Sequence, residues 1–201
     1  VCIENDSQNL KYEIFSRLNL GAVKLHDQEV RNCIYRGSFN DMLKDIAQSN
    51  PNLPILFHDN DTRYSYEERI LRFFALRDME LNGTYKLMMN RFMEIHQNDD
   101  ENTLKKLKNQ YNSLIELVKN VCGDDAFFAI SEQRRKFNGA VYDSIMIPFS
   151  FFPKKNIIMH ADEIRDAIYK LKNEDKEFQD CVYAGTKQIS CVSLFDSSYK
   201  S

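Results

Sequence analysis

Residues 98–123 read NDDENTLKKLKNQYNSLIELVKNVCG, and this stretch decides the fold class. Its apolar side chains recur at alternating intervals of three and four residues, which is the spacing of one face of an amphipathic helix. A polar break at residues 98–100 precedes the helix, and Cys122 with Gly123 ends it. A seam of this length must pack against another helix. Its members are Leu104, Leu107, Tyr111, Leu114, Val118 and Val121.

The composition of the whole chain agrees with this interpretation. The 201 residues include only six glycines and four prolines, too few for the many turns of a β protein. Hydrophobic residues make up 43% and charged residues 28% of the chain, as in an ordinary globular domain rather than a disordered one. We therefore predict an all-α fold, a multi-helix bundle.

Further helices are expected on both sides of the seam, because apolar-periodic runs alternate with residues that cap or break helices. Asp27 and Asn40 are expected to cap two of them, and Ser65 with Glu68 forms the pattern of a capping box. Pro148 is expected to end another. The predicted ranges are 9–18, 27–35, 40–48, 66–79, 85–96, 135–147, 156–173, 176–183 and 186–195.

Two features bear on how the chain is organised. Residues 1–3 are typical of the end of a β-strand, and because a lone strand needs a sheet, we expect an upstream domain to supply one. The first half is loop-rich and the second half is rich in long helices, so we predict two subdomains, residues 1–97 and 98–201. The bulky Phe149, Phe151 and Phe152 are expected in the core or as an anchor between helices.

Charge and cysteine content narrow the partners and the compartment. The net charge is −3, without the basic excess that phosphate neutralisation favours, so direct DNA binding is the weakest hypothesis. The five cysteines are odd in number and scattered without a CxxC pair, which favours reduced thiols in a cytoplasmic protein over disulfides or a zinc site. No apolar run has the length of a membrane span, so no membrane partner is expected.

The residues that commonly carry chemistry form no complete catalytic set. The four histidines lack the HxxxH and HExxH spacings of metal sites, and Asp59 and Asp61 lack the full pattern of a calcium loop. Arginines and a lysine at residues 134–136 meet an expected helix start, which mildly favours an anion contact, although a solvated surface is the preferred interpretation. We expect no cofactor within the chain and no complete enzyme.

The densest polar signal lies in residues 14–32, IFSRLNLGAVKLHDQEVRN. Two expected helices meet there at a tight turn. Arginine and asparagine side chains together are able to hold phosphate oxygens or a base edge. The same side chains also cap helices and form ion pairs, so a binding role and a structural role are both open. The polar residues at this junction are Arg17, Asn19, Gln28, Glu29, Arg31 and Asn32.

This segment resembles a pattern of the domain-of-unknown-function 262 family (GmrSD-type proteins), approximately IFxRLNxGGxxLxxQExRNxxY. The chain departs from it at Ala22, where the family usually has a second glycine. Residues 68–75 are similar to the ExxLRFxA helix of that family, and Asn90 and Met93 fit a looser element. The positions that match the first pattern are Ile14, Phe15, Arg17, Leu18, Asn19, Gly21, Leu25, Gln28, Glu29, Arg31, Asn32 and Tyr35.

The resemblance implies that this chain is the helical part that follows a ParB/sulfiredoxin-like domain. In that family the N-terminal domain carries a DGQQR motif and binds or hydrolyses a nucleoside triphosphate. Many members belong to modification-dependent restriction and phage-defence systems, often with an HNH nuclease domain. Neither motif occurs here, so a nucleoside triphosphate with Mg and modified DNA are expected only for a longer protein.

By the same resemblance, Arg17, Asn19, Arg31 and Arg72 lie near the nucleotide. The structural alternative for Arg72 is an ion pair with Glu68, four residues earlier on the same helix. The sequence thus favours a helical fragment of a nucleotide-dependent restriction or phage-defence protein. The alternative is a non-enzymatic helical scaffold for protein interactions, which predicts a large exposed apolar patch.

Overall fold

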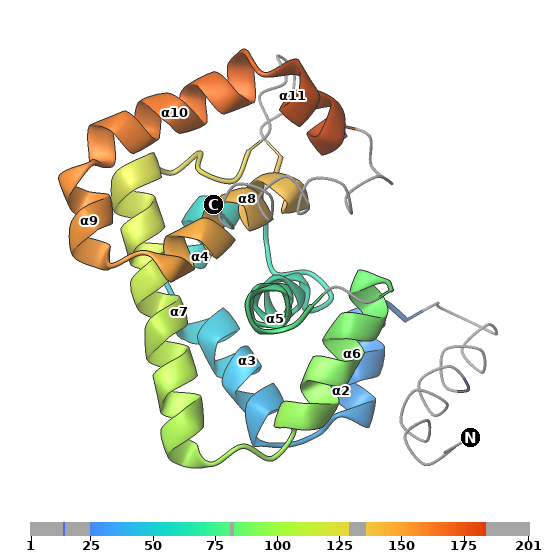
Figure 1. Cartoon of the computed structure of the whole chain (residues 1–201). Helices are drawn as coiled ribbons and strands as arrows, with labels where there is room; N and C mark the ends of the chain where they lie inside the picture. The colour runs from blue at the N-terminus through green and yellow to red at the C-terminus, as the bar shows by residue number, and fades with distance from the viewer. Residues whose placement is uncertain (1–13, 15–24, 81–82, 129–135, 184–201) are drawn as a thin grey trace. The chain divides into compact units, whose positions relative to one another are not determined.

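The computed structural model describes residue 14 and residues 25–80, 83–128 and 136–183, and these are organised as helices α2 to α11 (Figure 1). Within these ranges the only β feature is an isolated antiparallel bridge between Phe128 and Phe137. The predicted all-α class is therefore confirmed. The strand expected at residues 1–3 and the helices expected at residues 9–18 and 186–195 lie outside the described residues, apart from Ile14, which is helical.

The chain forms two compact units. One comprises residues 1–50 and 61–112, and the other comprises residues 51–60 and 113–201. Helix α7 (Glu101–Cys122) contributes its first part to unit 1 and its second part to unit 2. The division expected between residues 97 and 98 stays a prediction.

Unit 1 is built around α5 (Ser65–Asp78). This helix contacts α2 (Asp27–Ile34), α3 (Ser38–Ser49) and α6 (Tyr85–His96), as Figure 1 shows. Aromatic side chains of α3, α5, α6 and α7 fill its core, and all of them are almost completely buried. Such burial is the main source of stability for a helical bundle. The core rings are Phe39, Phe73, Phe74, Phe92 and Tyr111.

Unit 2 contains α4 (Leu53–Phe57), the second part of α7, and α8 (Gly139–Phe151). It continues with α9 (Lys154–Met159), α10 (Ala161–Asn173) and α11 (Lys176–Tyr183). Four rings form a second aromatic cluster, with centroids 4.9–6.3 Å apart in edge-on or tilted pairs. They are Phe57, Phe127, Phe137 and Tyr142. Among the described residues no helix combines the length and the apolar character needed to cross a membrane.

Three predicted caps are wrong, because in each case the helix begins earlier than the capping residue requires. Ser65 is already the first residue of α5, and its expected role falls to Asp61, whose carboxylate accepts the Tyr66 N–H at 3.0 Å. Asp27 is likewise the first residue of α2; there the Glu29 carboxylate accepts the backbone N–H of His26. Asn40 lies inside α3 and is buried.

Pro148 does not end its helix, contrary to the prediction. Helix α8 runs past it to Phe151, and Asn138 begins the helix by accepting the N–H groups of Ala140 and Val141. Proline removes one helical hydrogen bond. Tyr142, Met146 and Phe149 are buried at helical spacing on both sides of Pro148, and this burial offsets the loss.

The expected core role of the three neighbouring phenylalanines is only partly correct. Phe149 is buried, whereas Phe151 and Phe152 are exposed because they lie at and beyond the end of α8. The single helix predicted for residues 156–173 is also wrong. A break at His160 separates α9 from α10, and no residue of α10 is fully buried.

Candidate functional site

Buried polar side chains gather in unit 1. A buried polar group destabilises a fold unless a hydrogen-bond partner satisfies it. Several buried polar groups in one unit therefore indicate a hydrogen-bonded network or a binding site. In unit 2 only Asp143 belongs to this class among the described residues. The members in unit 1 are Gln28, Arg31, Asn40, Asn50, Glu67 and Asn90.

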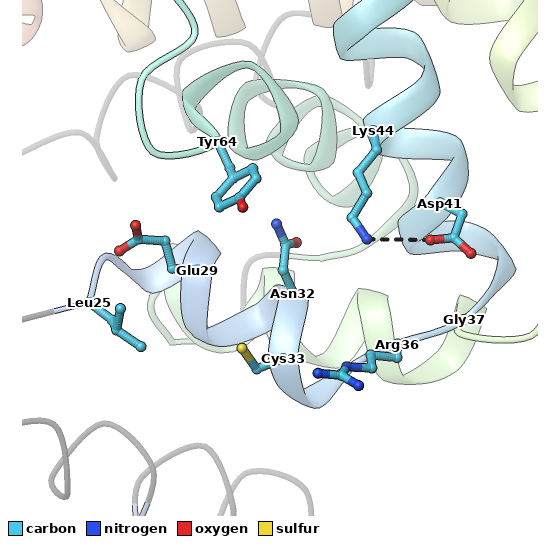
Figure 2. Close-up of a pocket in the computed structure, with 9 residues that line it drawn as sticks. All are labelled: Leu25, Glu29, Asn32, Cys33, Arg36, Gly37, Asp41, Lys44 and Tyr64. Carbon is cyan, nitrogen blue, oxygen red and sulfur yellow. Dashed lines mark hydrogen bonds and ion pairs between the residues drawn. The ribbon is translucent and has the colours of Figure 1, made fainter.

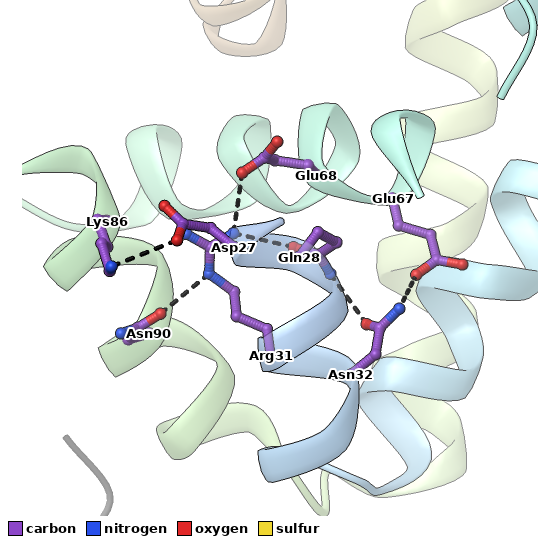
Figure 3. Close-up of polar contacts among 8 residues, drawn as sticks. All are labelled: Asp27, Gln28, Arg31, Asn32, Glu67, Glu68, Lys86 and Asn90. Carbon is purple, nitrogen blue, oxygen red and sulfur yellow. Dashed lines mark hydrogen bonds and ion pairs between the residues drawn. The ribbon is translucent and has the colours of Figure 1, made fainter. Parts of the chain in front are cut away.

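Arg31 stands at the centre of the larger group, and its side chain is fully buried. Its Nε donates to Oδ1 of Asn90 at 2.9 Å, and its Nη1 donates to Gln28 and Glu68, each at 3.0 Å (Figure 3). The three partners come from α6, α2 and α5. The guanidinium therefore ties three helices together and is fixed in direction. Among the residues that the structure describes, its Nη2 has no hydrogen-bond partner.

A directional chain of hydrogen bonds continues from Arg31 along α2. Gln28 accepts from Arg31 through Oε1, so its amide nitrogen must face the other way. That nitrogen donates to Oδ1 of Asn32 at 3.1 Å, and Nδ2 of Asn32 donates to the Glu67 carboxylate at 2.7 Å. Each amide thus fixes the orientation of the next. We call this chain, from Glu68 through Arg31, Gln28 and Asn32 to Glu67, the polar network.

Within the polar network, the carboxyl group of Glu67 has a raised pKa. Its residue is only 2% exposed, and burial raises the pKa of its carboxyl from 4.5 to about 7. The hydrogen bond from Asn32 and the charge of Lys44 lower that pKa, and the charge of Asp61 raises it. The carboxyl therefore changes its charge near neutral pH, as groups in functional sites frequently do.

A cavity of about 580 Å³ lies beside the polar network, over one face of α2 and the start of α3 (Figure 2). This volume lies in the range of small-molecule sites. Asn32 belongs both to the network and to the cavity wall, so the network holds one wall residue in a set orientation. The polar and aromatic residues that line the cavity are Glu29, Asn32, Arg36, Asp41, Lys44 and Tyr64.

The charges of the cavity are partly compensated. Lys44 lies 3.3 Å from the carboxylate of Asp41, and Arg63 lies 3.3 Å from that of Glu29. For Arg36, no ion pair of the guanidinium occurs within the part of the chain that the structure describes. The cavity wall thus carries two cations, Arg36 and Lys44, and two carboxylates, Glu29 and Asp41, and Arg63 outside the wall is paired with Glu29.

Tyr64 reaches the cavity through an unusual backbone. It and Arg63 have φ angles of 64° and 54°, in the left-handed region that residues with side chains rarely adopt. Each such residue costs about 1 to 2 kcal/mol. The Arg63–Glu29 ion pair and the Asp61 cap of α5 hold this conformation in place. The Tyr64 side chain consequently projects at the cavity, where the residue is 45% exposed.

Of the four site residues expected from the sequence, the structure describes Arg31 and Arg72, which have different surroundings. Arg31 is the buried centre of the polar network, and the Arg72 guanidinium lies over the Tyr85 ring, 4.1 Å from its centroid. Arg17 and Asn19 lie outside the described residues. Proximity of these four residues to a nucleotide stays a prediction. Glu67, Lys44 and Tyr64 were not predicted as site residues.

Unit 2 carries a smaller polar group where α7 ends. Lys172 donates to the carbonyl oxygens of Ala126 and Asp125, and Arg165 donates to that of Val121 at 2.9 Å. Burial lowers the pKa of Lys172 to about 8 and raises the pKa of the Cys122 thiol to about 11. Because cations at a helix C-terminus satisfy its carbonyl groups, these side chains have a structural role. The described residues contain no cluster suited to hold a metal ion.

Comparison of the chain with protein-family models, curated proteins and solved structures gave no match.

Proposed function

We propose that this chain is the helical part of a nucleotide-dependent, modification-dependent restriction or phage-defence protein, similar to the domain-of-unknown-function 262 family. The supporting observation is the polar network. Four of its members and one further partner come from the three separate segments that carry the resemblance. Gln28, Arg31 and Asn32 belong to the first segment, Glu68 belongs to the second, and Asn90, a partner of Arg31, belongs to the third.

The sequence separations make this convergence informative. Arg31 and Asn90 are 59 positions apart, and Arg31 and Glu68 are 37 apart, yet both pairs are hydrogen-bonded. Chance matches to a short pattern have no reason to interlock in space. Residues that jointly satisfy one buried guanidinium must lie close together, because removing any of them leaves buried polar groups without partners.

In this proposal the described helices position groups rather than perform a reaction. Arg31 is held by three partners and is buried, so its function is to orient α2 and Asn32. The nucleoside triphosphate with Mg and the modified DNA belong to a longer protein that includes a ParB/sulfiredoxin-like domain. This chain alone is expected to hydrolyse no nucleotide.

The test uses the longest natural protein that contains these residues. We expect it to hydrolyse a nucleoside triphosphate and to reduce phage plating in bacteria that express it. Asn19→Ala is expected to lower both activities, whereas Asn156→Ala, at an exposed position of α9, is the matched control and leaves both unchanged. A full-length protein that neither binds nor hydrolyses any nucleoside triphosphate contradicts the proposal.

One observation favours the second candidate, a helical interaction scaffold. Unit 2 exposes several large apolar side chains around α8 to α10, with Phe151 65% and Met159 66% exposed. Such a group of side chains is typical of a protein-binding surface. Phe151→Ser together with Met159→Ser is expected to weaken self-association or partner capture in analytical ultracentrifugation. A wild-type chain that stays monomeric and captures no partner counts against this candidate.

A further inference from the structure

We infer that the cavity over α2 and α3 binds a nucleoside monophosphate group, with the base on Tyr64, the phosphate between Arg36 and Lys44, and a polar contact from Asn32. This inference deepens the proposed function and rests on it. All of the residues involved belong to unit 1.

Tyr64 offers a ring face at a position that the fold maintains at a cost. Two consecutive residues in the left-handed region destabilise the chain unless the conformation is held, and here an ion pair and a helix cap hold it. The result is an aromatic side chain that is nearly half exposed at a cavity wall rather than buried in the core. A planar base stacks on such a ring, and this contact is expected to tighten binding about tenfold.

The cations of the cavity are available to an anion. Asp41 competes weakly for Lys44, because its side chain is 75% exposed and their ion pair is screened by solvent. Glu29 is engaged by Arg63, which lies outside the cavity wall. Arg36 is at the surface and its planar guanidinium suits the two oxygens of a phosphate.

Asn32 supplies the directional contact. Its Nδ2 uses one hydrogen for Glu67 and its Oδ1 uses one lone pair for Gln28, so one donor and one acceptor are left over. The polar network prevents the amide from turning over. A fixed donor beside a fixed acceptor recognises the edge of a base or a ribose hydroxyl.

The test is isothermal titration calorimetry on the 201-residue chain with the four ribonucleoside monophosphates, ribose 5-phosphate and inorganic phosphate. We expect at least one monophosphate to bind about tenfold more tightly than ribose 5-phosphate, which lacks the base. Tyr64→Gly is expected to abolish that difference and Tyr64→Phe to preserve it. Glycine adopts the left-handed backbone without strain, so this variant keeps its fold.

Matched controls lie elsewhere on the surface. Lys44→Ala is expected to weaken every phosphate-containing ligand about tenfold, whereas Lys106→Ala and Tyr169→Ala, at exposed positions, change nothing. Equal affinity for ribose 5-phosphate and the monophosphates overturns the inference, as does unchanged binding by Tyr64→Gly. The proposed function is tested separately, by hydrolysis and phage plating of the longer protein, so either proposal is able to fail alone.

Discussion

Each of the two units of this protein is stabilised internally by different interactions. In unit 1 a buried guanidinium, three amides and two carboxylates join α2, α5 and α6 beside an aromatic core. In unit 2 the central place is taken by the four-ring cluster around Phe127, and Arg165 and Lys172 donate to backbone carbonyl groups at and after the end of α7. Hydrogen bonds require one geometry, whereas packed rings tolerate several.

This difference assigns different tasks to the units. Directional bonds transmit an orientation from Glu68 through Arg31 to Asn32, and Asn32 forms part of the cavity wall. A ring cluster contributes stability without fixing the direction of any polar group. Binding chemistry is therefore expected in unit 1. Conservative substitutions in the two units are expected to lower the free energy of unfolding by different amounts.

The largest effect is expected for Arg31→Met, which preserves much of the apolar volume but leaves Glu68, Asn90 and Gln28 without their common partner. We expect the free energy of unfolding to fall by about 3 to 5 kcal/mol. Phe127→Leu, at an equally buried position of unit 2, is expected to cost less than about 1.5 kcal/mol. Urea denaturation measures both. Equal losses would remove the contrast between the units.

The next effect concerns pH. The Glu67 carboxyl has a higher pKa in the folded chain, about 7, than its ordinary value of 4.5, so the folded chain binds this proton more tightly. Its contribution to stability is complete below pH 4.5 and is lost as the pH rises through 7. The free energy of unfolding is expected to fall by about 3 kcal/mol across that interval.

Glu67→Gln is the matched variant for this pH effect. It is expected to keep the contact with Asn32, to remove most of the decline, and to be more stable than wild type at pH 8. The pH dependence of stability that Lys172 in unit 2 contributes has the opposite sign, because burial lowers the pKa of Lys172 from 10.5 to about 8. Its charged form is disfavoured in the folded chain, so stability rises as the pH increases through that range. A wild-type decline that persists in Glu67→Gln would assign it to another group.

The smallest expected difference in stability between the units concerns one glycine in each of them. A Cβ at Gly37 in unit 1 would lie 2.2 Å from the carbonyl oxygen of Gln97, so Gly37→Ala must displace backbone and is expected to cost about 1 to 3 kcal/mol. Gly123 in unit 2 has open space around it but a φ of +80°. Gly123→Ala is expected to cost about 1 kcal/mol through backbone strain alone. Thermal denaturation in which Gly37→Ala is the milder change would contradict the close approach.

The sequence predicted the elements that depend on local pattern. The all-α class, the end of α7 and the bounds of α6 and α11 follow from apolar periodicity and breakers. Pro148 and His160 were interpreted wrongly, because the packing of α8 outweighs the loss at proline and no local signal marks the break between α9 and α10. Burial, which is a tertiary property, decided the case of Pro148.

The candidate site was predictable to a similar extent. Gln28, Arg31 and Asn32 are three and four residues apart, which places them on one face of a helix and indicated a polar cluster. Glu67 could not be distinguished from its neighbour Glu68, because only the fold buries one and leaves the other half exposed. Tyr64 gave no signal, since its role depends on a backbone conformation that the sequence does not specify.

The convergence of separate segments on Arg31 is the central claim, and a double-mutant cycle tests it most directly. The free energy of unfolding is measured for wild type, Arg31→Met, Glu68→Gln and the double variant. Because the guanidinium donates to the carboxylate at 3.0 Å from a fully buried position, we expect an interaction energy of about 1 to 3 kcal/mol. If the losses in the free energy of unfolding are additive, with an interaction energy near zero, the segments that contain Arg31 and Glu68 do not meet and the polar network is absent.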